Sequence, residues 1–351
     1  MSTQQLDGTK LIYHTEALAR WKRGEVVYPI QLEISPTQAC NHKCTFCYYE
    51  YTARSKAFLD RDLWERLLRE AASLGTKSVF YSGEGEPLMH KDILEMVELG
   101  AELGYDQALN TNATALTEKV ATRILPHLEW MRVSVNGVTA KDYAEVHQCP
   151  PEHFERAVTN VERAAKFKRD NGLKVAIGVQ CVYTGQPLDE VHSFVKRLRD
   201  AGVSYYSLKP GMPHPDNPNF VAAPFPSHEQ LASIVDLATP DFQVAVRWGL
   251  REQDWKRPYT KCLSLPFFAE VTADGKVYAC GPHLGEENFC YGSLHEITLK
   301  DMWSHEGRAK VEKHVCGIGD FDKVCMPLCR LDQVNRFLWD LENPPPSVNF
   351  I

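Results

Sequence analysis

Cys40-Asn-His-Lys-Cys44-Thr-Phe-Cys47 is the stretch of sequence around which the fold and the chemistry of this chain can be worked out. Its cysteines follow C-x3-C-x2-C spacing, and three thiolates can bind a four-iron, four-sulfur cluster while leaving its fourth iron open to another ligand. Two alternatives stay open on spacing alone. One is a zinc ion with a distant fourth ligand, for which His42 lies nearby, and the other is three buried cysteines that share no ligand.

The composition of the 351-residue chain, with 44% hydrophobic and 24% charged residues, is typical of a soluble globular protein. A net charge of −7 and the lack of a long Lys/Arg run argue against a nucleic-acid partner. The N-terminus has no export signal, and no apolar run is long enough to span a membrane, so no membrane partner is expected. Eleven cysteines in such a chain indicate metal or redox use in a reducing, cytoplasmic compartment.

Apolar strands alternate with amphipathic helices from residue 28 to about residue 240. Strands are expected at 26–35, 77–81, 106–110, 130–135, 175–183, 204–208 and 242–247. Helices of this length between strands imply right-handed crossovers and a parallel sheet. We expect an α/β fold, a partial (β/α)6 TIM-like barrel, with a doubly wound open sheet as the alternative. In both folds, ligands bind at the C-terminal ends of the strands, where the cysteine loop lies.

The cysteine spacing, with Phe46 just before the third cysteine, resembles the signature of the radical S-adenosylmethionine (radical SAM) enzymes. Further on, Ser82-Gly83-Glu84-Gly85-Glu86-Pro87 resembles their G-G-E-P element, except that Glu84 replaces the first glycine. The resemblance implies that Cys40, Cys44 and Cys47 hold a 4Fe–4S cluster whose fourth iron binds S-adenosylmethionine. It also implies a reductant such as flavodoxin or ferredoxin, and a 5′-deoxyadenosyl radical that abstracts hydrogen from a C–H bond.

Short polar stretches after the strands are the expected contacts of S-adenosylmethionine. The edge formed by Gly85, Glu86 and Pro87 accepts from the methionine amine in the family, and an ordinary turn between strand and helix is the alternative. Asn112 and Ser134 are similar in position to the family's ribose- and carboxylate-contacting residues, with helix capping and turn chemistry as the alternative. The expected cofactor-binding residues are Phe46, Gly85, Glu86, Pro87, Asn112 and Ser134.

Two residues are candidates for catalysis. Lys209 and His214 lie in a proline-rich loop after the sixth strand, where they would meet an anionic substrate, although a solvated loop with incidental polar groups fits equally. Cys181 and Cys149 belong to neither cysteine group. Burial is the ordinary role of such cysteines, and the catalytic alternative is a hydrogen-atom donor that quenches a substrate radical. We therefore name Cys181 and Lys209 as the catalytic candidates.

Six of the eleven cysteines lie between residues 262 and 329, where the alternation of strands and helices stops. The Cys262-x12-Gly275-x4-Cys280 spacing resembles the opening of the SPASM and Twitch extensions, which add auxiliary clusters to radical enzymes. Gly319 stands where a full SPASM pattern has a cysteine, so we expect a single auxiliary 4Fe–4S cluster. Its expected ligands are Cys262, Cys280, Cys325 and Cys329, with Cys316 or Cys290 as substitutes. Zinc bound by four cysteines is the competing interpretation.

The expected domains are an N-terminal lead-in (1–27), the barrel (28–250), a SPASM/Twitch-like domain of hairpin and helices (255–341) and a tail (342–351). Peptide maturases of the family commonly carry an N-terminal recognition domain, and the lead-in is short. We therefore expect a small polar metabolite as substrate (a sugar, aminocyclitol or antibiotic precursor), oxidised or epimerised by an oxidoreductase or isomerase. Peptide or protein modification is the alternative. A non-catalytic zinc or electron-transfer protein is the third hypothesis.

Overall fold

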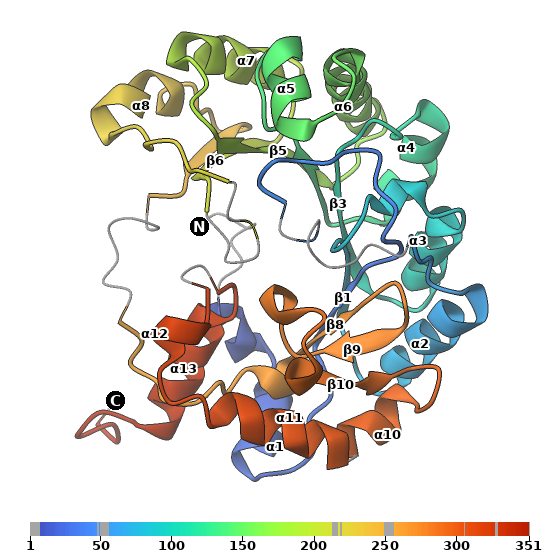
Figure 1. Cartoon of the computed structure of the whole chain (residues 1–351), viewed down its shortest axis with the longest axis vertical. Coiled ribbons are helices and arrows are strands. Elements are labelled where there is room, and N and C mark those ends of the chain that lie inside the picture. Colours follow the sequence, from blue (N-terminus) through green and yellow to red (C-terminus); the bar gives the residue numbers. More distant parts are fainter. Residues whose placement is uncertain are drawn as a thin grey trace.

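The computed structural model describes residues 8–47, 49, 56–212, 217, 220–248, 256–304, 306–326 and 329–350. Its centre is a ten-stranded sheet with the strand order β10-β9-β8-β1-β2-β3-β4-β5-β6-β7 (Figure 1). Neighbouring strands from β1 to β7 all pair in parallel. These strands are β1 (Gln31–Ile34), β2 (Ser78–Tyr81), β3 (Asp106–Thr111), β4 (Trp130–Ser134), β5 (Ala176–Tyr183), β6 (Tyr205–Pro210) and β7 (Gln243–Val246).

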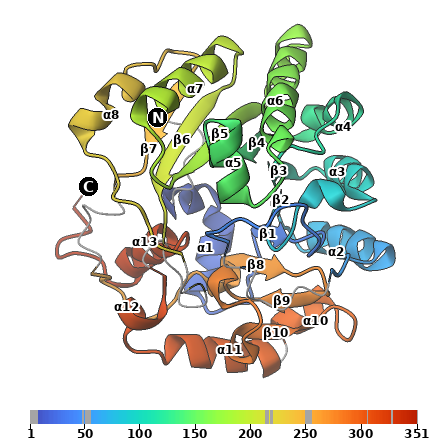
Figure 2. The same ribbon diagram turned by 45° about the horizontal axis from the view of Figure 1, so that its top comes forward.

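Helices connect the parallel strands and lie on the outer side of the curved sheet (Figure 2). They are α2 (Arg61–Ser73), α3 (Ile93–Glu102), α4 (Glu118–Ile124), α5 (Ala140–His147), α6 (Glu152–Asp170), α7 (Leu188–Asp200) and α8 (His228–Val235), with the short helices η3 (Pro87–Met89) and η4 (Leu125–His127). Helix after strand, repeated six times before β7, confirms the predicted partial (β/α)6 barrel.

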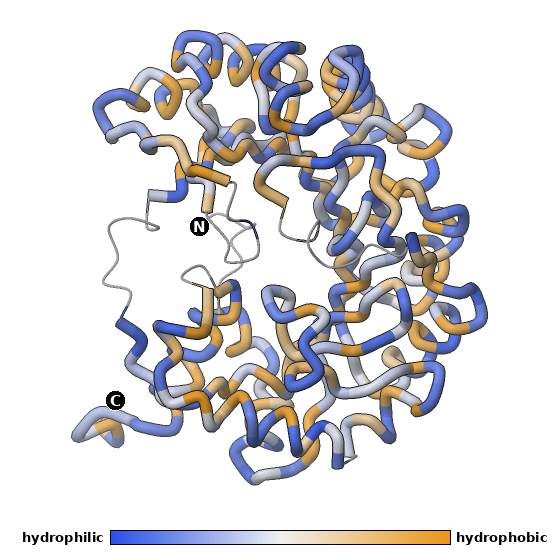
Figure 3. The backbone as a smooth tube through the Cα atoms, in the orientation of Figure 1, coloured by the Kyte–Doolittle hydropathy of each residue, from blue (hydrophilic) through white to orange (hydrophobic). Residues whose placement is uncertain are grey.

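The apolar pattern explains why these elements form. In α2, Leu63, Trp64, Leu67, Leu68 and Ala71 are buried at helical spacing, and the Asp60 side chain caps the helix by accepting from two backbone N–H groups. Hydrophilic and hydrophobic segments alternate along the ring of helices in the same way (Figure 3). Strand β5 is buried at every position after its first. Parallel strands that helices cover typically have such nearly continuous apolar sequences.

The C-terminal segment joins the same sheet. Strand β8 (Phe268–Val271) pairs in parallel with β1, and it forms an antiparallel meander with β9 (Lys276–Tyr278) and β10 (Cys290–Ser293). Gly275 takes a φ of +79° in the turn between β8 and β9, a conformation that glycine adopts without strain. The other elements are η5 (Leu265–Phe267), η6 (Gly281–His283), η7 (Glu287–Phe289), α10 (Leu299–Ser304), α11 (Glu306–Cys316), α12 (Phe321–Val324) and α13 (Asp332–Glu342).

The N-terminal lead-in packs against the C-terminal part of the chain. It forms η1 (Gly8–Tyr13) and α1 (Thr15–Lys22), and a small second core joins Leu11 and Val27 to Phe267 and to Leu338 of α13. The division into four domains therefore stays a prediction, and its boundary between 250 and 255 lies outside the described residues, as do residues 1–7. Within the described part of the chain, no helix has the length and apolarity needed to cross a membrane.

Candidate functional site

A cavity of about 430 Å³ lies at the C-terminal ends of the parallel strands, and three parts of the chain form its wall. The first is the cysteine loop after β1, and the second is a set of polar residues that end β2 to β6. The third is the C-terminal segment, which contributes Cys280, Gly281 and Cys329 among others. The pairing of β8 with β1 therefore places the C-terminal segment beside the predicted site.

Cys40, Cys44 and Cys47 all line this cavity, together with Phe46. Backbone hydrogen bonds hold the loop in place: Lys43 N donates to His147 O (3.0 Å) and Thr45 N donates to Val146 O (2.9 Å). Both acceptors lie at the end of α5, so these hydrogen bonds attach the loop that carries the cysteines to this helix of the barrel.

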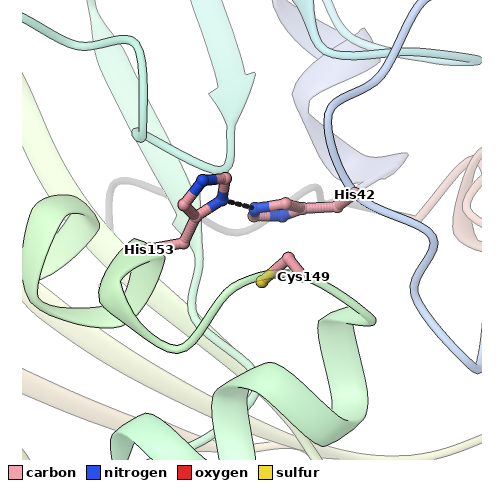
Figure 4. A group of neighbouring side chains, drawn as sticks. All are labelled: His42, Cys149 and His153. Atoms are coloured by element: carbon pink, nitrogen blue, oxygen red, sulfur yellow. Dashed lines mark hydrogen bonds between the residues drawn. The ribbon is translucent and has the colours of Figure 1, made fainter.

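His42, between the first two cysteines, lies in a small cluster with Cys149 and His153 (Figure 4). Its Nε2 lies 3.0 Å from His153 Nδ1, and burial lowers the pKa of His42 to about 4, so the ring is neutral near pH 7. Burial likewise raises the pKa of the Cys149 thiol to about 11. The cluster links the cysteine loop to the start of α6 through neutral groups.

The spacing of the thiols bears on whether they could hold a single metal ion. In tetrahedral zinc sites the Zn–S distance of about 2.3 Å places sulfur atoms roughly 3.8 Å apart. Among the described residues, the groups of three metal-ligating side chains whose ligand atoms lie within 4.8 Å of one another contain at most one cysteine each. In the described part of the chain, neither the loop cysteines nor the C-terminal cysteines therefore have three sulfur atoms as close together as a tetrahedral zinc site needs.

The Gly85-Glu86-Pro87 turn touches the cysteine loop directly. A Cβ atom on Gly85 would lie 2.4 Å from Thr37 O and 2.5 Å from Ala39 O, so only glycine fits there. Glu86 N donates to Ala39 O (2.9 Å). Gly85 and Glu86 line the cavity, whereas Pro87 is buried at the start of η3 and does not.

The Glu86 carboxylate is held by three donors. Its Oε1 accepts from Thr111 Oγ1 (2.5 Å) and Leu88 N (3.1 Å), and its Oε2 accepts from Asn112 N (2.7 Å). Burial raises the pKa of Glu86, and these hydrogen bonds oppose that shift. These three hydrogen bonds fix the Glu86 side chain in the cavity wall.

The two predicted polar contacts also reach the cavity. Asn112 lines it and donates from Nδ2 to Asn41 Oδ1 (2.8 Å), which ties the end of β3 to the cysteine loop. Ser134 lines the wall at the end of β4. Asn136, two residues after Ser134, and His147 are further wall residues that the sequence does not single out as ligand contacts.

Glu84, the departure from the family pattern, bridges two parts of the chain. Its Oε1 accepts from Gln38 Nε2 (2.8 Å), and its Oε2 accepts from Ala273 N in the turn between β8 and β9 (3.0 Å). The residue is buried. A glycine could not make these contacts, so the substitution gives the cysteine loop a direct link to the C-terminal segment. Its only signal in the sequence was the mismatch itself.

The structure brings the four predicted auxiliary cysteines together. Burial raises the pKa of Cys280, and the neighbouring thiols of Cys329, Cys262 and Cys325 raise it further. Cys280 and Cys329 line the cavity, while Cys262 and Cys325 lie behind them outside its wall. The substitutes differ: Cys316 Sγ lies 3.9 Å from Cys262 O, whereas the Cys290 thiol lies against Gly292 O in β10.

The two catalytic candidates have different surroundings. Lys209 lines the cavity at the end of β6. Cys181 is fully buried and does not line it: its Sγ lies 3.5 Å from Val182 O, and burial raises the pKa of the thiol to about 12. The catalytic roles of Cys181 and Lys209 stay predictions. His214 lies outside the described residues.

Residues 34–198 match the model of the Radical SAM superfamily. The PqqA peptide cyclase of Methylobacterium sp. (strain 4-46) is 26% identical over 305 residues, which is 79% of this chain and 73% of the relative. A probable GTP 3′,8-cyclase of Methanopyrus kandleri is 28% identical over 169 residues, 48% of this chain and 52% of the relative. The structure of Streptococcus suis SuiB bound to the precursor peptide SuiA covers 93% of this chain and 80% of its own, with a TM-score of 0.64 at 17% identity.

These comparisons correct one prediction from the sequence. The small polar metabolite, and with it the small-molecule substrate partner, is wrong: the similarity that covers most of the chain is to a peptide cyclase. The prediction rested on a lead-in too short for a recognition domain. That reasoning ignored the cavity wall itself, which the barrel and the C-terminal segment build together and which offers binding groups without any added domain.

Proposed function

Because this chain belongs to the radical SAM superfamily, we propose that it is a peptide-modifying enzyme that removes a hydrogen atom from a peptide substrate. One observation carries the proposal: the similarity to PqqA peptide cyclase extends over 305 residues, far beyond the match at 34–198. The similarity to GTP 3′,8-cyclases spans about half of this chain. The C-terminal segment borders the cavity, so the longer match is the more informative guide to the substrate.

Radical SAM enzymes use a 4Fe–4S cluster and S-adenosylmethionine, and we assign the cluster to Cys40, Cys44 and Cys47. When bound and reduced, the cluster supplies the electron that cleaves S-adenosylmethionine to the hydrogen-abstracting radical. The cysteine loop lines the same cavity as Gly85, Glu86, Asn112 and Ser134, which supports this assignment. We propose that this wall binds S-adenosylmethionine.

The residues of this wall are ordered before any ligand arrives. Glu86 already holds three hydrogen bonds, and a carboxylate has about four acceptor positions, so one remains for a donor such as an amine. The Asn112 side chain donates a hydrogen bond to Asn41 and accepts two from Thr114. Groups that are fixed in advance bind without a further ordering cost, which favours a single orientation of the cosubstrate.

We propose that Cys262, Cys280, Cys325 and Cys329 bind one auxiliary 4Fe–4S cluster. Their mutual proximity supports this ligand set, as does the position of Cys280 and Cys329 in the cavity wall. A metal group there would border the same space as the cysteine loop. Flavodoxin or ferredoxin as reductant and a cytoplasmic location remain predictions.

The experiment is an anaerobic incubation of the iron-reconstituted full chain with dithionite, S-adenosylmethionine and a random-sequence peptide library. We expect 5′-deoxyadenosine together with modified peptides. Mass spectrometry separates the outcomes, since a cyclising cross-link removes two hydrogens from the peptide and an epimerisation leaves the mass unchanged. The control is the variant with Cys40→Ala, Cys44→Ala and Cys47→Ala.

Two results would contradict the proposal. No 5′-deoxyadenosine from a chain with its full iron content would argue against radical chemistry. Cleavage of S-adenosylmethionine with GTP converted and every peptide unchanged would place the chain with the nucleotide cyclases instead.

A further inference from the structure

Three cationic side chains line one end of the cavity. Arg132 lies in β4, Lys209 lies in β6 and Arg247 directly follows β7. The cysteine loop follows β1 and the Glu86 turn follows β2, whereas Lys209 and Arg247 lie toward the other end of the row of parallel strands and Arg132 lies on its middle strand, β4. All three line the same cavity as the predicted cosubstrate wall, and Arg132 shares β4 with Ser134 of that wall.

No carboxylate in the described residues balances this positive charge. None of the three cations forms an ion pair within 4.0 Å in the part of the chain that the structure describes. The acidic residues of the same cavity are engaged elsewhere: Glu33 pairs with Arg330, Glu84 with Gln38 and Ala273, and Glu86 with its three donors. The cavity therefore has a distinct positive end.

Arg132 is held in a defined orientation at this end. Its Nε donates to Asn110 Oδ1 (3.2 Å), and its guanidinium carbon lies 5.8 Å from the Phe80 ring centre and 5.7 Å from that of Trp130. Aromatic contacts of this kind stabilise a cation and restrict its motion. One N–H is used by Asn110, and the other guanidinium donors stay available in the fixed geometry that suits a carboxylate.

The pKa of Lys209 is lowered by burial and by its position beside the two arginines. The pKa of Lys209 is lowered to about 7, first by burial and then by the positive charges of Arg132 and Arg247. Repulsion among three cations destabilises the folded chain when no anion is bound between them. A bound anion would restore the lysine charge and remove the repulsion, and groups perturbed in this way concentrate at functional sites.

We propose that Arg132, Lys209 and Arg247 form a carboxylate subsite that binds an acidic side chain of the peptide substrate. The assignment of a peptide rests on the proposed function. Arginine binds carboxylates with paired hydrogen bonds, and lysine adds a point charge. Anchoring an Asp or Glu side chain here would place the neighbouring peptide residues in the middle of the cavity, between the subsite and the cysteine loop.

The same chemistry has another source, because S-adenosylmethionine also carries a carboxylate. Lys209 on β6 and Arg247 after β7 lie on other strands than the cosubstrate wall, whereas Arg132 shares β4 with Ser134 of that wall. Phosphate groups of a nucleotide are the third ligand that three cations could bind. The experiment distinguishes all three.

The test measures binding to the reconstituted full chain in the presence of S-adenosylmethionine, by calorimetry. The probes are N-acetyl-L-glutamate α-methylamide and the matched glutamine compound, with GTP as a third ligand. Charged hydrogen bonds predict that the glutamate probe binds about tenfold tighter or more than the glutamine probe. Lys209→Met should remove most of this preference, Lys209→Arg should keep it, and Lys196→Met, an exposed lysine on α7, should leave it unchanged.

Several results would overturn the subsite. Equal affinity for the two probes would do so, as would a Lys209→Met chain that loses affinity for S-adenosylmethionine and keeps the glutamate preference. GTP binding that is tighter than the glutamate probe and sensitive to the same variants would assign the cations to a nucleotide. Iron content and circular dichroism of each variant establish that it is folded, and Arg247→Gln provides a second, more exposed position.

The subsite and the proposed function can fail separately. Peptides modified regardless of acidic residues, with no probe preference, would remove the subsite and leave the function. A clear preference for the glutamate probe in a chain that modifies no peptide would do the reverse.

Discussion

The two groups of cysteines reach the same cavity by different routes. Cys40, Cys44 and Cys47 lie on one loop, and their spacing alone brings them together. The C-terminal cysteines come from separate segments that lie near one another, and the pairing of β8 with β1 places their part of the chain beside the cavity. The first group is a local motif and the second is a product of long-range packing, so the two should respond differently to mutation.

The contacts behind the second group are correspondingly specific. A Cβ on Gly281, next to Cys280, would lie 2.6 Å from Glu270 Oε2, so the chain passes close to a buried carboxyl group there. Burial, and then the nearby Glu84, raise the pKa of Glu270 to about 8. The loop cysteines rest on simpler backbone contacts with α5.

The largest effect is expected at the local motif. Replacing Cys40, Cys44 and Cys47 with alanine should abolish formation of 5′-deoxyadenosine and lower the iron content from about eight to about four atoms per chain. The chain should stay folded because backbone hydrogen bonds to α5 hold the loop in addition to the Cys44 contact with His147. A loss of all iron would mean that the two groups are not independent.

Removal of one C-terminal cysteine should separate the two groups from the other side. Cys280→Ala should lower the iron content by up to about four atoms, keep cleavage of S-adenosylmethionine and prevent peptide modification. Cys290→Ala is the matched control, since its thiol lies in β10 apart from the other four. Equal iron loss in both variants, or zinc in place of iron, would refute the assigned ligand set.

Glu84 joins the two regions, so changing it tests their connection. In Glu84→Gln one side-chain oxygen still accepts a hydrogen bond, but the amide N–H₂ group that replaces the other oxygen meets a second donor. We expect the free energy of unfolding to fall by about 1–3 kcal/mol. Hydrogen exchange at the Ala273 amide, which donates to Glu84, should become faster. The control is Glu65→Gln, because exposed ion pairs such as Glu65–Arg69 contribute little. Unchanged exchange at Ala273 would remove Glu84 as the link.

The smallest effect is a pH dependence of anion binding. A lysine with a pKa lowered to about 7 is charged below that pH and loses its proton above it. Affinity for the glutamate probe should therefore fall several-fold between about pH 6 and pH 8.5. Burial lowers the pKa of the neighbouring Arg132 and Arg247, but guanidinium groups keep their proton in proteins, and the raised pKa of Tyr205 keeps it neutral. Lys209→Arg should flatten the profile, and an equally steep profile in that variant would assign the titration to another group.

The order and position of the parallel strands could be read from the sequence. The stretches expected at 106–110 and 175–183 correspond to β3 (Asp106–Thr111) and β5 (Ala176–Tyr183), because uninterrupted apolar runs between helices are a local signal. The expected hairpin around Gly275 was also found, since its turn residues are local as well.

Other features of the site had no such signal. The pairing of β8 with β1 joins segments more than two hundred residues apart, and neither strand differs in pattern from its neighbours. Cys181 sits at a strand end, as a catalytic residue would, yet it is fully buried and absent from the cavity wall. Arg132 and Arg247 looked like ordinary strand residues until the sheet placed them beside Lys209.

The sequence by itself determined the chemistry of the cysteine loop, the Gly85-Glu86 turn and the barrel, because each depends on residues close together in the chain. Only the tertiary structure decided that one cavity is shared by the barrel and the C-terminal segment, that Glu84 links them, and that three cations lie at its far end. The physical reason is that such contacts depend on strand pairing and on the curvature of the sheet, which bring distant side chains together without leaving a periodic pattern in the sequence.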